Sequence, residues 1–363
     1  SGTSGSSGTS GSSGTSGSSG TSGTNVGSSA VIVLGAGTYS SVRENVNNTA
    51  VGDYSASLGG KSNYSTGNYS TITGGLKNLV TKDCSVIGGG LLNCVGSNQS
   101  SILGGYCNEV VSDCSSIVGG SGNYVSGDYS VIAGGGSGGA TGNRISGRRS
   151  FIGSGRGQLV SGNYSSAVGG YFNCAIGDYS FVGGGGGYFS AYGIPLGNKS
   201  CGNHSFIGGG RQNITNGSAN VIVGGGGFNP VFGLGGNNTF CNYSIVVGGF
   251  NNESSYCGAY NPAGFANTGG FVGGGFGNLA SGAGSVVVGG IPSTYVPGLA
   301  GSNNTACGLS SFIGSGSENS ACGDGSVVVG GGAIFGGLLG FVGNNITSYG
   351  CLSSIVGGTR NCI

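Results

Sequence analysis

The sequence predicts an all-β fold, a parallel β-solenoid with about 15 residues and two short strands in each coil. The first observation is a fixed period, which is clearest in SSIVGGSGNYVSGDYSVIAGG at Ser115–Gly135. A period this regular decides the architecture before residue propensities do. The second observation is that each unit carries a Gly-Gly and a Ser-Gly pair, and the third is that the chain contains no Trp or Met. Serines mark the period at positions fifteen residues apart: Ser55, Ser70, Ser85, Ser100, Ser115 and Ser130.

Each unit is expected to form strand, turn, strand and turn. Fifteen residues are too few for a helical repeat, and the glycine pairs would break a helix. Successive units then stack with their strands roughly 4.8 Å apart. Alternation along the first strand points Ser115, Ile117 and Gly119 inward, and Ser116 and Val118 outward. Such an interior is narrow, which agrees with the absence of Trp and Met.

The outward positions of the first strand are apolar in several late units. Examples are SIVVGG at Ser244–Gly249, SVVVGG at Ser285–Gly290 and SVVVGG at Ser326–Gly331. A strand that is apolar on both faces is usually covered on both. We therefore expect a homo-oligomer in which other copies of the chain cover this stripe.

Composition excludes several classes of partner. Ninety-one glycines and 6% charged residues are far from globular averages, and the net charge is +1. This charge gives no reason to expect nucleic acid or an anionic membrane as partner. No apolar run is long enough for membrane insertion. Twelve cysteines indicate an oxidising location, although buried thiols in a stacked column are the simpler explanation.

Three regions follow from the pattern. Residues 1–24 carry Gly at every third position, the collagen signature, but contain no proline. We interpret them as a stalk or assembly segment; a flexible Gly/Ser linker fits equally well. Residues 25–182 form the regular solenoid, with one five-residue expansion at Gly134–Gly142. Residues 183–363 continue it with longer insertions.

The insertions are the candidate binding loops. Each adds about ten residues and is expected to follow the Gly-Gly corner, so that all emerge along one edge. Insertions on one face of a solenoid commonly carry binding or assembly surfaces. They occupy Gly185–Leu196, Gly226–Gly236, Asn251–Gly264, Ile291–Gly301 and Gly332–Gly343. The aromatic candidates within them are Tyr192, Phe232, Tyr260, Tyr295 and Phe335.

Catalytic groups are not evident. Most acidic residues fall in one turn slot, two residues before a repeat serine, where Asn also recurs because both cap turns and tolerate left-handed conformations. The only histidine, His204, occupies a corner slot that other units fill with Tyr. No triad or zinc spacing results, so we expect no enzyme activity, cofactor or metal. The tyrosines themselves should stack as a ladder that seals one edge or, alternatively, binds sugar.

Two kinds of modification are predicted. Cys307 and Cys322 fall in equivalent corners of successive coils, at a separation that a disulfide tolerates. Among many Asn-x-Ser/Thr sequons, four recur near the ends of inserted loops and are the candidates for glycans. They are Asn198, Asn237, Asn303 and Asn345.

The unit SIVGGSGNYVSGDYS resembles the haemagglutinin-like repeats in the heads of trimeric autotransporter adhesins. The similarity covers about Gly52 to Ile363, through the Ser-x-Ile-x-Gly-Gly and Val-Ser-Gly elements. It implies a left-handed parallel β-roll that forms trimers through its apolar strand face. The cysteines, the insertions and the Gly-X-Y tail depart from that family, and they fit a viral or phage fibre or a secreted filament equally well.

These features predict a self-assembling structural fibre or filament subunit that is extracellular, on a cell surface or on a virion surface. The alternative is a carbohydrate- or receptor-binding adhesin head that uses the inserted loops. An ice-binding solenoid is a weaker alternative, because the expected Thr-x-Thr ladder is missing. The last coil stops partway, at Gly357–Ile363, which predicts head-to-tail contacts; a truncated chain would look the same.

Overall fold

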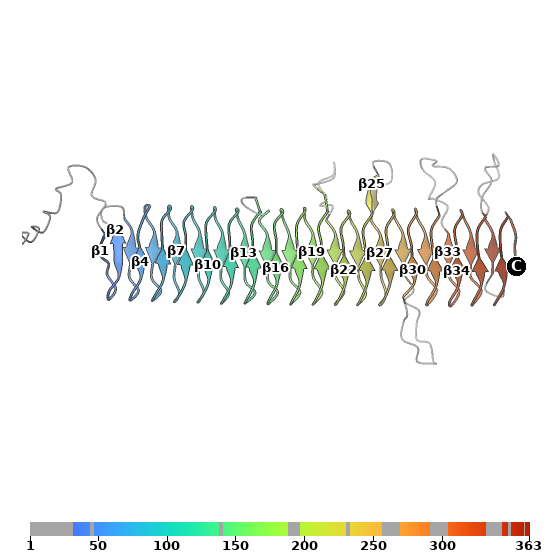
Figure 1. The fold of residues 1–363 in the computed structure, drawn as a ribbon, viewed down its shortest axis with the longest axis horizontal. Helices are drawn as coiled ribbons and strands as arrows, with labels where there is room; N and C mark the ends of the chain where they lie inside the picture. The colour runs from blue at the N-terminus through green and yellow to red at the C-terminus, as the bar shows by residue number, and fades with distance from the viewer. Residues whose placement is uncertain are drawn as a thin grey trace, which may run out of the picture.

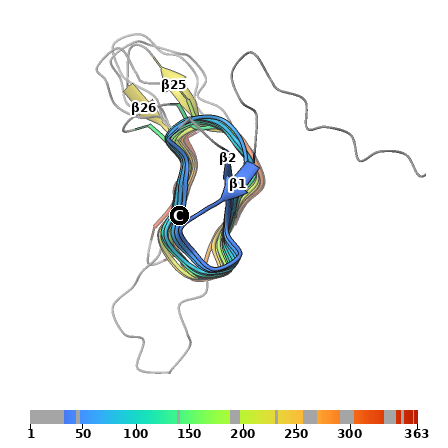
Figure 2. The same ribbon diagram turned by 90° about the vertical axis from the view of Figure 1, so that its left-hand side faces the viewer.

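The computed structural model is a straight rod of stacked coils that runs from the N-terminal to the C-terminal part of the chain (Figure 1). Seen along the rod, the coils superpose on one flattened outline (Figure 2). The structure describes these residues: 32–43, 47–137, 141–187, 197–229, 233–255, 269–290, 304–331, 343–347, 350–358 and 360–363.

Two long sheets, A and B, form opposite walls of the rod, and the chain alternates between them. The strands of sheet A are β1 (Ile32–Leu34), β2 (Ser41–Arg43), β4 (Ala56–Ser57), β6 (Thr71–Ile72), β8 (Val86–Ile87), β10 (Ser101–Ile102), β12 (Ser116–Ile117), β14 (Val131–Ile132), β16 (Phe151–Ile152), β18 (Ser166–Ala167), β20 (Phe181–Val182), β22 (Phe206–Ile207), β24 (Val221–Ile222), β28 (Ile245–Val246), β30 (Phe271–Val272), β32 (Val286–Val287), β34 (Phe312–Ile313), β36 (Val327–Val328) and β38 (Ser354–Ile355). The strands of sheet B are β3 (Thr49–Ala50), β5 (Tyr64–Ser65), β7 (Leu79–Val80), β9 (Cys94–Val95), β11 (Glu109–Val110), β13 (Tyr124–Val125), β15 (Arg144–Ile145), β17 (Leu159–Val160), β19 (Cys174–Ala175), β21 (Lys199–Ser200), β23 (Ile214–Thr215), β27 (Asn238–Thr239), β29 (Glu253–Ser254), β31 (Leu279–Ala280), β33 (Thr305–Ala306), β35 (Ser320–Ala321) and β37 (Asn345–Ile346).

Equivalent residues of successive coils pair in register. In sheet A, Ile102 lies beside Ile117, and in sheet B, Val110 lies beside Val125. All these pairs are parallel except the first, in which β1 pairs antiparallel with β2. The predicted parallel β-solenoid of about 15 residues per coil is therefore confirmed.

The core is a column of small apolar side chains between the two sheets. Ile117 of sheet A and Val125 of sheet B are both fully buried, as their counterparts are in most coils. Ser115 is buried too, whereas Val118 is 46% exposed. The predicted alternation is therefore confirmed from Ser115 to Val118. The inward placement of Gly119 is wrong. A Cβ on Gly119 would meet open space, because the chain has already left the strand and turned.

The second glycine of the pair is the one that the corner requires. Gly120 has φ +93°, and a Cβ there would lie 2.0 Å from the carbonyl oxygen of Gly135 in the next coil. Glycine adopts this conformation without the steric cost that other residues incur. The corner therefore depends on Gly120 for both its conformation and the close approach of the next coil.

One insertion lies at the other corner. The extra residues of most long coils separate a sheet A strand from the following sheet B strand, as predicted. The prediction for Asn251–Gly264 is wrong, because the extra residues of that coil follow β29 and precede β30. Asn252 and Asn278, equivalent residues of successive coils, are accordingly 26 residues apart instead of 15.

Candidate assembly surface

A ladder of asparagines runs inside the rod at the Gly-Gly corner. Asn108 is fully buried, and its Oδ1 accepts the backbone N–H of Asn123 in the next coil at 3.0 Å. Its Nδ2 donates to the carbonyl oxygens of Gly104, at 3.1 Å, and Gly120, at 3.0 Å. Each such side chain therefore ties its own corner to the next one. Most of the described coils repeat the arrangement, including those that carry insertions.

The ladder contradicts two predicted glycan sites. Asn198 and Asn237 are rungs of it, fully buried, and the Nδ2 of each donates two hydrogen bonds. A glycan on Nδ2 would displace these bonds and collide with the neighbouring coil, so both predictions are wrong. Asn345 is exposed on sheet B and stays a candidate. Asn303 lies outside the described residues.

One rung of the ladder is imperfect. Gln158 occupies the asparagine slot, and its Nε2 donates to the Gly170 carbonyl oxygen at 2.6 Å. Its Oε1 is buried and has no hydrogen-bond partner among the described residues. The longer side chain thus fails to offer the N–H of Asn173 the acceptor that an asparagine offers elsewhere in the ladder.

We expect Gln158→Asn to raise the free energy of unfolding by about 1–2 kcal/mol, because it removes one buried unsatisfied oxygen and restores one rung. Asn143→Gln is the matched reverse change and should lower it by a similar amount. Chemical denaturation of the two variants beside the parent checks the sign. Equal stabilities would show that the rungs are energetically neutral.

Serines form a second internal ladder at the opposite corner. The backbone N–H of Ser115 donates to Ser100 Oγ at 3.1 Å, and Ser115 Oγ donates to the Gly127 carbonyl oxygen at 3.0 Å. The Ser115 hydroxyl is thus satisfied inside the rod, which burial of a polar group normally requires. The hydroxyls of Ser55, Ser244 and Ser326 in the same slot are buried without a partner among the described residues. The recurring serine is therefore a structural residue of the corner and is not exposed to a substrate.

The same corner carries an external ladder of Asp and Asn. The N–H of Asn68 donates to Asp83 Oδ1 at 2.8 Å, and that of Asn98 donates to Asp113 Oδ1 at the same distance. The left-handed residue is the next one along, such as Tyr69 with φ 54°, so the expected left-handed Asp or Asn is wrong. These carboxylates and amides bind backbone N–H groups of the neighbouring coil.

The left-handed slot holds the predicted aromatic ladder. Tyr164, Tyr179 and His204 stack with ring centroids 4.9 Å apart and nearly parallel planes. Tyr54 and Tyr69 stack in the same way nearer the N-terminal end. Within each stack the facing ring surfaces cover one another, so sugars cannot stack between them. Tyr164 lies between Arg149 and Tyr179, and Tyr179 lies between Tyr164 and His204, so these two tyrosines offer a ligand only their ring edges and hydroxyls.

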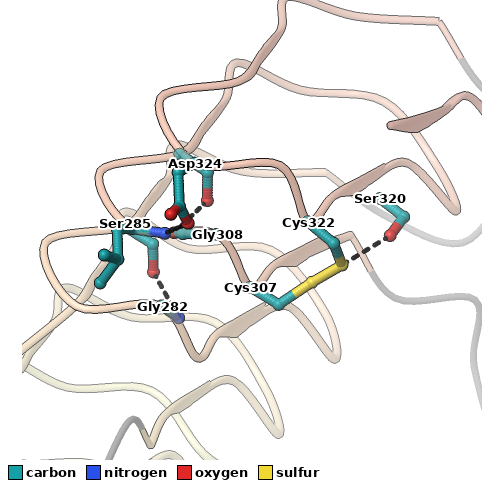
Figure 3. The surroundings of a disulfide bond; sticks show 9 residues. Gly282, Ser285, Cys307, Gly308, Ser320, Cys322 and Asp324 are labelled. Carbon is teal, nitrogen blue, oxygen red and sulfur yellow. Dashed lines mark hydrogen bonds between the residues drawn. A yellow bond between two sulfur atoms is a disulfide. The ribbon is translucent and has the colours of Figure 1, made fainter. Parts of the chain in front are cut away.

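The candidate disulfide joins two adjacent coils. Cys307 follows β33 and Cys322 follows β35, and the structure links them with their Cα atoms 4.5 Å apart (Figure 3). The in-register pairing of Ala306 with Ala321 places the two side chains beside each other. The disulfide therefore links two neighbouring coils covalently on the outer face of sheet B.

Several other cysteines are partly covered thiols. Burial raises the pKa of Cys94, and the nearby Glu109 carboxylate adds to the effect. Burial also raises the pKa of Cys174 and of Cys201, while Lys199 acts in the opposite direction on both. Because the thiolate is the reactive form of cysteine, these three side chains are poorly suited to act as nucleophiles near neutral pH.

The outer face of sheet A is continuously apolar in the C-terminal half. We call this face, from β20 to β36, the apolar strip. It comprises the first residue of each strand and the residue two positions later. Val223, Val247, Val288 and Val329 lie in its second row and are 40–51% exposed. The members of the strip are Phe181, Gly183, Phe206, Gly208, Val221, Val223, Ile245, Val247, Phe271, Gly273, Val286, Val288, Phe312, Gly314, Val327 and Val329.

The strip is also flat. Wherever its first row carries Phe, its second row carries Gly, and the ring lies over that glycine: a Cβ on Gly208 would be 3.3 Å from the Phe206 ring. Phe181 and Phe206 stack at 5.3 Å with an interplanar angle of 4°. Polar residues such as Thr71, Ser101 and Ser116 interrupt the same face in the N-terminal half. The uninterrupted apolar surface is therefore confined to the later coils, although single apolar residues such as Leu103 and Val118 are exposed on the same face earlier in the chain.

The remaining predicted sites lie in parts of the chain that the structure does not describe. The loop aromatics Tyr192, Phe232, Tyr260, Tyr295 and Phe335 lie outside the described residues, as does the 1–24 segment. Within the described ranges, no three His, Cys, Asp or Glu side chains gather as a metal site would need. The described part of the chain also contains no helix with the length and apolarity that crossing a membrane requires.

No protein-family model matches the sequence, and no curated protein is significantly similar to it.

Proposed function

We propose that this chain is a structural subunit of an extracellular, cell-surface or virion-surface fibre, and that it assembles laterally through the apolar strip. The observation that carries the proposal is the strip itself, two apolar rows across eight strands of sheet A. It is roughly 34 Å long at the usual strand spacing. A contiguous apolar surface of this kind marks an interaction site.

The contrast with sheet B supports this choice of face. Sheet B presents Arg144, Lys199, Glu109 and Glu253 among its outward residues, which water solvates well. Sheet A presents no charged residue along the strip. A second copy of the chain offers a surface of the same shape and spacing. Trimers of left-handed β-rolls, as in the adhesin heads that the repeat unit resembles, would bury such a face around a common axis.

Axial growth is a separate part of the proposal. At the N-terminal end, β1 occupies the edge of β2 in an antiparallel pair. A head-to-tail neighbour would therefore meet β1 on sheet A, where Leu34 is 83% exposed, and could not continue the parallel ladder there. We place the main contact laterally for this reason.

Substitutions that introduce charges into the apolar strip test the proposal. Val247→Lys combined with Val288→Lys should convert the oligomer to monomers, because both ammonium groups would be buried without partners in the interface. Light scattering over a range of concentrations measures the effect. Thr305→Lys is the matched control, since Lys199 occupies the equivalent slot on sheet B. A monomeric parent, or an oligomer that the double variant leaves intact, would contradict lateral assembly.

A carbohydrate- or receptor-binding head is the second candidate, and one described insertion favours it. The extra residues after β24 include an antiparallel hairpin, β25 (Gly227–Asn229) and β26 (Gly233–Gly235), that projects outside the coil outline (Figure 2). Phe250 of the next coil packs against its base, where a Cβ on Gly235 would lie 1.9 Å from the ring. A supported projection of this kind can present a binding loop. Loss of ligand binding on deletion of residues 227–235, with assembly unchanged, would favour this function.

A further inference from the structure

One coil departs at once from the external Asp/Asn ladder and from the aromatic ladder beside it. Arg148 occupies the Asp/Asn slot and Arg149 the left-handed aromatic slot, with φ 52°. Arg148 has no carboxylate or amide oxygen to accept the N–H of Asp128, so it cannot form that rung of the ladder. Natural proteins break such local rules mainly at functional or strained sites. Four of the eleven Lys and Arg residues lie between positions 144 and 156.

Arg149 is held in a fixed position. Its guanidinium lies between two tyrosine rings, 5.6 Å from the Tyr129 centroid and 5.4 Å from the Tyr164 centroid. One of its nitrogens, Nη1, also donates to the Tyr164 hydroxyl. The rings cover both faces of the planar group and leave its remaining N–H edge to solvent. A pre-organised guanidinium edge matches the two oxygens of a carboxylate or sulfate.

The arginine pair borders a shallow hollow of about 170 Å³. Its lining also includes the side chains of Asn163, Tyr179 and Asp178. Asp178 Oδ1 accepts the Asn163 N–H at 2.7 Å, and Arg148 Nε lies 3.5 Å from Asp128 Oδ2. The hollow thus combines cationic donors with neutral amide and hydroxyl groups and with one carboxylate, that of Asp178, which already accepts the Asn163 N–H. It lies at the corner, apart from the apolar strip.

We propose that this hollow binds an acidic saccharide, with Arg149 and Arg148 on one carboxylate or sulfate and with the tyrosine hydroxyls and Asn163 on neighbouring sugar hydroxyls. A polyanion is disfavoured, because Asp113, Asp128 and Asp178 lie along the same corner. The ligand therefore carries an isolated anionic group among neutral sugars. Ring edges face the ligand, so recognition is by hydrogen bonds and charge and not by stacking.

Binding of 3′-sialyllactose and 3′-sulfolactose to the full chain tests the proposal, with lactose as the neutral counterpart. Titration calorimetry should show at least one of the two acidic sugars bound at least tenfold more tightly than lactose. The sialylated and sulfated probes distinguish carboxylate from sulfate. Arg149→Tyr should weaken acidic-sugar binding at least tenfold. It should keep the fold, because Tyr fills the same slot in neighbouring coils.

Arg211→Gln is the control for an exposed arginine elsewhere on the rod and should leave binding unchanged. Equal binding by Arg149→Tyr and parent, or equal affinity for lactose, would overturn the proposal. So would inorganic sulfate that binds as tightly as the saccharides, which would mean an adventitious ion only, or a strong preference for heparin. Assembly measured on the same samples is a separate readout, so a failure here leaves the lateral contact untouched.

Discussion

Replacing Ile117 with Asp will lower the free energy of unfolding by at least about 4 kcal/mol, because it places an unpaired charge in a dry column. Ile117 is fully buried between Ile102 and Ile132 of the adjacent coils. Stability in a stacked repeat is shared between neighbours, so β10 and β14 should loosen with β12. Amide hydrogen exchange in these three strands, together with chemical denaturation, measures both effects.

Ser116→Asp is the matched control. Ser116 precedes Ile117 in the same strand but faces outward, where a carboxylate stays in water. Its effect should stay within about 0.5 kcal/mol, as for other surface changes. If the two variants unfold at the same denaturant concentration, the buried column does not carry the stability of the rod.

Replacing Asn108 with Leu should cost about 2–4 kcal/mol, although a buried polar residue becomes apolar. The change removes the acceptor of the buried Asn123 N–H and the donor to the carbonyl oxygens of Gly104 and Gly120. The apolar gain of Leu does not offset a buried N–H left without a partner. The measurement is the free energy of unfolding, with exchange of the Asn123 amide as the local probe.

Glu109→Leu serves as the control for this second variant, because Glu109 is the next residue and is exposed on sheet B. It should leave both the stability and the Asn123 amide protection nearly unchanged. An Asn108→Leu variant as stable as the parent would mean that the ladder is a consequence of stacking and not a cause of it.

The period predicted the coils well because side chains in a strand alternate strictly. Spacing alone located Ile117 in the core and Val118 outside. At the corners the alternation ends, and the sequence no longer says where a side chain points. Gly119 was therefore misplaced, and the buried role of the asparagine slot was missed. The fixed spacing of Asn78, Asn93, Asn108 and Asn123 was the available signal.

The loss of alternation at the corners also explains the errors at the insertions. Asn198 and Asn237 end long loops and resemble surface sequons, but counting back from the next strand places them in the ladder slot. The insertion after β29 was misassigned because glycines flank it on both sides. The arginine pair at 148 and 149 was visible as a departure from the repeat, but its position between two tyrosine rings required the structure.

Cryo-EM of the full chain at the concentration where it assembles tests the central claim most directly. Lateral assembly predicts several parallel rods that bury the apolar strip against one another, from β20 to β36, with sheet B and the Arg149 corner facing solvent. Single rods with Val247 and Val288 in water, or rods packed through sheet B, would contradict it.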